Sequence, residues 1–243
     1  MVPLRRFFYR QRVPACPVGK ITGVPVRPVS PDRLVTQLSD LIVDLRPSGW
    51  LRVAVDGAEP ARPGELADAL VEPVRLRGRP ALRVSAADFL RPASVRLEHG
   101  RTDPDALYTD WLDTAGLARE VLDPLGPAGS GRVLPSLWDA AADRATRADY
   151  VSLPPGGVLL ADGALLLGRG LAFDLTVHLW LSPAALARKL PADQQWTIEA
   201  FSRYESEVSP RELADIVVRV DNPAHPAVMR GDSVMRDQYR RDS

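Results

Sequence analysis

The sequence predicts an α/β protein in which five parallel strands form one sheet that helices cover on both faces. Three observations support this prediction. Short apolar runs alternate with amphipathic helical segments along the chain. The runs at 51–55 and 158–161 are almost continuously apolar, which is typical of strands buried on both faces. A length of 243 residues with 45% hydrophobic residues suits one domain of this class.

We expect three segments along the chain. Residues 1–28 are basic and rich in proline, and we interpret them as a flexible N-terminal arm. Its arginines alternate with aromatic residues, a pattern found both in solvated tails and in segments that bind anionic partners. Residues 29–223 form the α/β domain. Residues 224–243 carry many charges, so we expect a frayed C-terminal tail.

The first helix is predicted to start at Ser30 and Pro31, because serine caps helix N-termini and proline fits the first turn. Leucine and isoleucine then recur at helical spacing until the Pro-Ser-Gly segment at 47–49 ends the pattern. The chain continues with a strand at 51–55, a helix at about 64–72, a strand at 81–85 and a loop at 86–101.

The second half of the domain carries the same kinds of signal. The segment Asp103-Pro104-Asp105 predicts a helix that carries Tyr108 and Trp111, and Gly116 to Val121 begins another. Residues 123–135 are rich in glycine and proline and predict a loop. The remaining strands are expected at 158–161, 175–180 and 214–220, and the remaining helices begin at Ser182-Pro183 and span 194–207.

Residues 51–70 have the strand–loop–helix frame of a nucleotide-binding P-loop but lack the groups that bind phosphate. The motif requires Gly, four residues, and then Gly-Lys-Ser/Thr. Gly57 is present, whereas Arg62, Pro63 and Gly64 hold the last three positions. Pro63 has no backbone N–H, Gly64 has no hydroxyl for magnesium, and both lysines of the chain are distant in sequence. The segment therefore also fits an ordinary strand-to-helix turn.

Composition excludes several classes of protein. A formal net charge of zero gives no global field for nucleic acid, so we expect no nucleic-acid partner. A single cysteine excludes a disulfide framework, and the three histidines lack metal-ligand spacing. No uncharged apolar run reaches the ~18 residues of a membrane span, and the N-terminus is a poor signal peptide. We therefore expect a cytoplasmic protein without a membrane partner.

Three aspartates lie at the expected strand ends. Asp56 and Asp162 each precede a glycine directly after an apolar run, and Asp88 follows the strand at 81–85. Ligands bind at the carboxyl ends of the strands in parallel sheets. We therefore expect these three carboxylates to converge on one site.

Taken in order along the chain, several segments resemble the bacterial uridine kinase family, a branch of the P-loop nucleoside kinases. The resemblance extends from about Val26 to about Pro226. The similar segments are RPVSPDRLVTQLSDLI, VAVDG, SAADFLRP, HGRTDPDALYTDWLD, EVLDPLGPAGSGR, PPGGVLLADGALLL and ADIVVRVDNPAHP. This resemblance implies a three-layer P-loop NTPase-like fold.

The resemblance also implies roles for individual residues, with magnesium and ATP as cofactors if the protein is active. The position of the family's general base is Ala87, and Asp88 follows one residue on. The implied site consists of the catalytic residues Asp88 and Asp162, with Asp162 also acting on magnesium, the nucleotide-binding residues Gly57, Arg62, Arg188 and Arg203, and the substrate-binding residues Arg91 and Tyr108.

Two hypotheses for the function follow, together with a weaker third. The first is a uridine kinase-like protein with lost or impaired phosphoryl transfer that binds a nucleoside or nucleotide or acts in protein interactions, with no cofactor. The alternative is an active nucleoside kinase whose lysine-less phosphate site is rebuilt from Arg62, Asp88 and Asp162. The third is an enzyme of different chemistry on the same fold, because fold does not determine function.

Overall fold

The computed structural model describes residues 27–45 and 49–230. Most of the expected N-terminal arm and the last residues of the expected tail lie outside these ranges. Within them, no helix is long and apolar enough to cross a membrane.

The central sheet has seven strands in the order β1-β11-β10-β9-β2-β8-β3. Strands β10, β9, β2, β8 and β3 pair in parallel, as predicted. The predicted total of five is wrong, because β11 and β1 continue the sheet with antiparallel pairing beyond β10. The strands are β1 (Arg27–Pro28), β2 (Leu51–Asp56), β3 (Ala81–Ser85), β8 (Val158–Gly163), β9 (Leu175–Trp180), β10 (Ile216–Arg219) and β11 (Ala227–Arg230).

Helices and short ribbons surround this sheet. The α-helices are α1 (Pro31–Asp44), α2 (Pro63–Leu76), α3 (Ala93–Arg96), α4 (Pro104–Thr109), α5 (Thr114–Leu117), α6 (Pro183–Lys189), α7 (Ile198–Glu207) and α8 (Pro210–Leu213). Short 3₁₀ segments are η1 (Glu59–Ala61), η2 (Ala86–Phe89), η4 (Asp123–Leu125) and η5 (Ala192–Thr197), and η3 (Ala118–Leu122) is a π-turn. Two small antiparallel pairs are β4 (Arg132–Val133) with β7 (Val151–Ser152), and β5 (Trp138–Asp139) with β6 (Arg144–Ala145).

The predicted start signals lie where the helices begin. Ser30 Oγ accepts a hydrogen bond from the Arg33 amide at 3.3 Å, and Asp103 accepts one from the Ala106 amide at 2.7 Å. The expected loops are more ordered than predicted. Residues 86–101 contain η2 and α3, and residues 123–135 contain η4 and β4. Strand β11 lies within the segment for which we expected a frayed tail.

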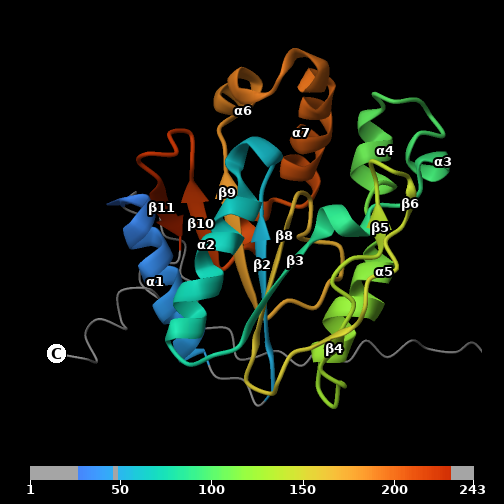
Figure 1. The fold of residues 1–243 in the computed structure, drawn as a ribbon. Helices are drawn as coiled ribbons and strands as arrows, with labels where there is room; N and C mark the ends of the chain where they lie inside the picture. The colour runs from blue at the N-terminus through green and yellow to red at the C-terminus, as the bar shows by residue number, and fades with distance from the viewer. Residues whose placement is uncertain (1–26, 46–48, 231–243) are drawn as a thin grey trace, which may run out of the picture.

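The sheet is covered on both faces, as the α/β prediction requires. Val53, Val55 and Leu160 pack against apolar residues of α1 and α2. Leu159 and Ala161 point to the other face and pack against η3 and its neighbours. In Figure 1, α1 and α2 lie beside one face, α4 and α5 lie beyond the other, and α6 and α7 stand above the ends of the strands. The carboxyl ends of β2, β8 and β9 therefore lie beneath α6 and α7.

Strand register determines which polar side chains meet at this end of the sheet. Asp56 is in register with His178 of β9, and Asp162 of β8 is in register with Ser85 of β3. Asp162 is also in register with Val55, the neighbour of Asp56. Because successive side chains of a strand point to opposite faces, Asp56 and Asp162 lie on opposite faces of the sheet. The expectation that all three aspartates converge is therefore wrong for Asp56.

Asp56 is fully buried and accepts hydrogen bonds from three different segments. Its Oδ2 lies 2.7 Å from Nδ1 of His178 and 3.1 Å from the hydroxyl of Tyr204 on α7. Its Oδ1 accepts from the Leu166 amide at 2.9 Å. The Leu167 amide in turn donates to the Tyr204 hydroxyl at 3.0 Å. Burial raises the pKa of Tyr204 far above its ordinary value, so its hydroxyl keeps the proton that it donates.

We predict that Tyr204→Phe destabilises the protein by on the order of 2 kcal/mol, because it removes a donor to Asp56 and leaves the Leu167 amide unpaired in a buried site. Urea unfolding of the wild type and the variant measures this difference. The control is Tyr150→Phe, which removes the hydroxyl that donates to Glu120 from a side chain that is 49% exposed. The control should change stability by less than about 0.5 kcal/mol. Equal effects of the two substitutions would contradict the prediction.

Candidate functional site

A pocket of about 290 Å³ opens at the carboxyl ends of β3 and β8. Its walls are mostly apolar, and the aromatic rings of Trp111 and Phe201 lie on them. Its apolar lining comprises Pro60, Pro63, Ala86, Ala87, Leu90, Leu107, Trp111, Leu112, Ala164, Leu165, Leu190 and Phe201, and its polar lining comprises Glu59, Ser85, Asp162, Arg169, Gln194 and Thr197. An apolar concave site with a few polar groups is typical of small-molecule pockets.

The loop after β2 lies between a strand and a helix, as a P-loop does, and three of its amides already donate to backbone carbonyls. The Gly57 amide donates to the Gly163 carbonyl at 2.9 Å, and the Ala61 and Arg62 amides donate to carbonyls of the loop itself at 2.7 and 2.9 Å. Arg62 adopts the left-handed conformation (φ 59°), which glycine adopts without steric cost. Its side chain is 60% exposed and pairs with Glu65 at 3.2 Å. These amides are therefore not directed together at a bound phosphate.

Gly57 is needed for close packing against β9. A Cβ at this position would lie 3.0 Å from the carbonyl oxygen and 3.1 Å from Cβ of Leu179 on β9. The first glycine of the motif thus lets the loop pack against the neighbouring strand.

Asp162 is held by a bidentate ion pair with Arg83. Arg83 Nε donates to Oδ1 of Asp162 at 2.7 Å and Nη2 donates to Oδ2 at 3.1 Å. Ser85 Oγ donates to the same Oδ2 at 3.2 Å, and Nη1 of Arg83 lies 3.1 Å from both oxygens of Asp68. The Asp162 side chain is 5% exposed. Its hydrogen bond to Arg83 raises the pKa of that guanidinium, so the charge on Arg83 is permanent.

The residues of this site do not fit a magnesium ion held in the manner of a P-loop kinase. Such an ion is ligated by the P-loop hydroxyl and by the carboxylate at the end of the neighbouring strand. Gly64 has no hydroxyl, and both oxygens of Asp162 are bonded to Arg83. Within the described ranges, no group of three or more His, Cys, Asp or Glu side chains is arranged to hold a metal.

Asp88 lies in η2, close enough to Arg83 and Asp162 for their charges to act on it. Burial raises the pKa of its carboxyl group, and a hydrogen bond from Ser136 and the charge of Arg83 oppose the shift. Ala87, to which the resemblance assigns the general-base position, is exposed at the pocket wall. Asp88 is the predicted residue that the structure does bring close to Asp162.

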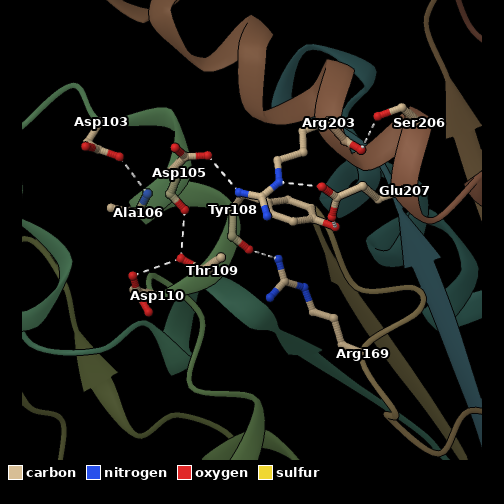
Figure 2. A network of polar contacts seen from close by, with 10 residues as sticks. All are labelled: Asp103, Asp105, Ala106, Tyr108, Thr109, Asp110, Arg169, Arg203, Ser206 and Glu207. Carbon is tan, nitrogen blue, oxygen red and sulfur yellow. Dashed lines mark hydrogen bonds and ion pairs between the residues drawn. The ribbon is translucent and has the colours of Figure 1, made fainter.

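Arg203 and Tyr108 tie α7 to α4, as Figure 2 shows. Arg203 donates to Asp105 of α4 at 2.7 Å and to Glu207 of its own helix at 2.8 Å. Its guanidinium lies 4.5 Å from the ring centroid of Tyr108, whose hydroxyl donates to Glu207 at 3.1 Å. Both predicted site residues therefore engage each other, and Tyr108 is not among the residues that line the pocket.

Arg169 approaches the same network from the segment between β8 and β9 (Figure 2). Its side chain donates to the carbonyls of Leu165 and Tyr108, and its guanidinium lies 5.3 Å from the Tyr108 ring centroid. It lines the pocket, and burial lowers its pKa. Among the residues that line this pocket, it is the one cationic side chain.

The other predicted arginines do not line the pocket. Arg91 and Arg188 are absent from its lining, and Arg188 lies in the last turn of α6. Arg62 lines a second hollow of about 370 Å³ between α1, α2 and the segment after β10. The predicted nucleotide-binding residues thus do not gather around one cavity.

Four residues of the site are not predicted by the sequence patterns. Arg83 and Ser85 alternate with apolar residues on β3. This pattern places both polar side chains on one face of the strand, but it does not indicate which residue they contact. Arg169 and Phe201 reach the pocket from segments without a motif. Strand register together with the end of β3 could have suggested Ser85, because it lies beside Asp162.

Comparison with solved structures places this fold beside kinases. The structure of a possible uridine kinase from Bacillus stearothermophilus superposes with a TM-score of 0.62 and 19% sequence identity, covering 76% of this chain and 97% of that one. A candidate fructose transport system kinase from Silicibacter sp. TM1040 gives a TM-score of 0.55 and 21% identity, covering 72% of this chain and 95% of that one. The sequence matches no protein-family model and no curated protein. The fold is therefore the P-loop kinase-like fold that the resemblance implied.

We predict that Asp88→Asn raises the melting temperature at pH 7. A carboxyl group whose pKa is raised on folding contributes stability below its unfolded pKa and loses it as the pH rises through the folded pKa. At neutral pH the wild type has lost this contribution, whereas the neutral asparagine retains it. The gain should therefore shrink as the pH falls below the carboxyl range, which melting curves between pH 3 and pH 7 measure.

Asp139→Asn is the matched control with the opposite sign. Hydrogen bonds from the Ala141 and Ala142 amides lower the pKa of Asp139, so its ionised form stabilises the fold above the unfolded pKa. This substitution should lower the melting temperature at pH 7. If Asp88→Asn lowers it as well, burial does not govern the charge state of Asp88.

Proposed function

We propose that the protein binds a nucleoside or nucleoside monophosphate at the carboxyl ends of β3 and β8 and does not transfer phosphate from ATP efficiently. One observation carries this proposal. The pocket is open and has the size of a small-molecule site, whereas the place of the metal beside it is filled by the ion pair between Arg83 and Asp162. The ligand-binding part of a kinase-like fold is thus present without its phosphate-transfer part.

The lining of the pocket supports a ligand that combines an aromatic ring with hydroxyl groups. Trp111 and Phe201 offer apolar aromatic surface to a base. Asp162 and Ser85 also line the pocket, and a carboxylate that already accepts three hydrogen bonds has capacity for one more from a sugar hydroxyl. Arg169 can offset the charge of one phosphate group.

A triphosphate lacks comparable support. The P-loop position that carries lysine is Pro63, and the cation before it, Arg62, lines the other hollow and pairs with Glu65. Arg203, one of the predicted nucleotide-binding arginines, is bonded to two carboxylates. Phosphoryl transfer depends on positioned cations around the phosphates. These contacts therefore disfavour ATP as a ligand.

One observation favours the alternative of an active nucleoside kinase. The raised pKa of Asp88 brings that carboxyl group closer to the range of a general base. In this alternative Asp88 takes the proton of the sugar hydroxyl in place of the residue that Ala87 replaces.

The proposal predicts binding without turnover. Calorimetry should detect uridine or uridine monophosphate binding without added metal, and a phosphorylation assay with magnesium and ATP should give far less than the ~1 s⁻¹ at the low end for kinases. Turnover at or above that rate, lost in Asp88→Asn, would establish the alternative instead. Absence of binding by any nucleoside or nucleoside monophosphate would contradict the proposal.

Two substitutions of alanine by phenylalanine test where the ligand binds. Ala87 is exposed and lines the pocket, so Ala87→Phe should fill it and weaken binding about tenfold or more without disturbing the core. Ala69 is exposed on α2 and lines the second hollow, so Ala69→Phe should leave the affinity unchanged. The reverse pattern would move the ligand to the hollow beside Arg62.

A further inference from the structure

We infer that Arg83 is the resident cation of the strand-end site, standing where a divalent metal would otherwise balance Asp162, and that Gly64 is the residue that makes room for it. The inference concerns the charge of the site rather than its ligand, so it does not depend on what the pocket binds. It makes Arg83 the residue that determines whether this site takes a divalent cation.

The geometry of Gly64 is the first step of the argument. A Cβ at residue 64 would lie 2.7 Å from Nη2 of Arg83 and 3.3 Å from Oδ2 of Asp162. A side chain there cannot coexist with the guanidinium in its present place. The hydroxyl-bearing residue that the P-loop motif requires at this position is therefore incompatible with Arg83 as it lies.

The fixed position of Arg83 is the second step. The far end of an arginine normally moves away from an added methyl group at little cost. Here the guanidinium is bonded to both oxygens of Asp162 on one side and to Asp68 on the other. Moving it away from residue 64 breaks these contacts and leaves Asp162, 5% exposed, without its counter-charge.

The balance of charge is the third step. Arg83 contributes one positive charge between two carboxylates, and Asp88 lies near enough for its charge to be felt. Magnesium is commonly held by one or two carboxylates with water completing its shell. Removal of the guanidinium therefore leaves a pair of carboxylates of the kind that takes magnesium or manganese, whereas its presence repels such an ion.

The test compares metal binding by the wild type and Arg83→Gln. In the wild type, millimolar magnesium or manganese should leave the melting temperature unchanged. Arg83→Gln should be less stable without metal, and either ion should raise its melting temperature by about 3 °C or more. Manganese titration followed by electron paramagnetic resonance should give at least about tenfold tighter binding in the variant.

Arg52→Gln is the matched control. Arg52 forms a bidentate pair with Asp174 at 2.8 and 2.9 Å and reaches no second carboxylate in the described structure, so its loss should destabilise the protein without rescue by metal. Equal metal rescue of the two variants would overturn the inference. Metal binding by the wild type as tight as that by Arg83→Gln would overturn it as well.

A second pair of variants tests the inference even if Arg83→Gln fails to fold. Gly64→Ala should lower the melting temperature of the wild type, although alanine is normally preferred to glycine in a helix. Gly49→Ala is the control, because a Cβ there meets nothing within 4 Å. If Gly64→Ala is as harmless as Gly49→Ala, the guanidinium does not occupy the place assigned to it. If Arg83→Gln folds, the cost of Gly64→Ala should disappear in that background.

Discussion

The burial of Asp56 constrains the end of the molecule at which β2, β8 and β9 have their carboxyl ends. A carboxyl group is stable in a protein interior only when hydrogen-bond partners surround it, and the three partners of Asp56 come from β9, from the segment after β8 and from α7. Each partner must be held at hydrogen-bond distance, so the carboxyl group fixes α7 above the strand ends. Helix α7 supplies part of the pocket wall, including Phe201, so the contacts of Asp56 also position that wall. Asp56 does this from the face of the sheet opposite to Asp162.

Local signals in the sequence were sufficient for most of the framework. Almost continuous apolar runs located β2 and β8, because strands buried on both faces leave such a signature, and apolar residues interrupted by polar ones located the other three parallel strands. Ser30 and Asp103 marked helix starts, because capping depends on residues three positions apart. The departure of Arg62, Pro63 and Gly64 from the P-loop pattern needs no structure to be seen, because that motif is contiguous. The antiparallel strand β11 was not predicted, since the prolines before it and the charges after it are typical of a tail.

The chemistry of the site depends on contacts that cross the sequence and could not be found from local patterns. Arg83 and Asp162 are 79 positions apart and meet through parallel pairing of β3 and β8. The resemblance implies that Tyr108 binds a nucleoside. In the structure its hydroxyl donates to Glu207 and its ring contacts the guanidinium of Arg203, and both partners lie nearly one hundred positions later in the sequence. An aspartate at the end of a strand can lie on either face of the sheet. Only the pairing register of β2 with β8 shows that Asp56 and Asp162 lie on opposite faces.

The strand β11 has a consequence for self-association. Without it, β10 would end the sheet with the unpaired backbone of Val217 and Val218, both buried in the folded chain. An apolar edge of this kind invites growth of the sheet by strands of other molecules. Two residues of β1 complete the cover, and Pro28 has no N–H to offer a further strand. The segments at 227–230 and 27–28 together therefore cover the edge of β10, and a chain that lacked β11 would be prone to aggregate.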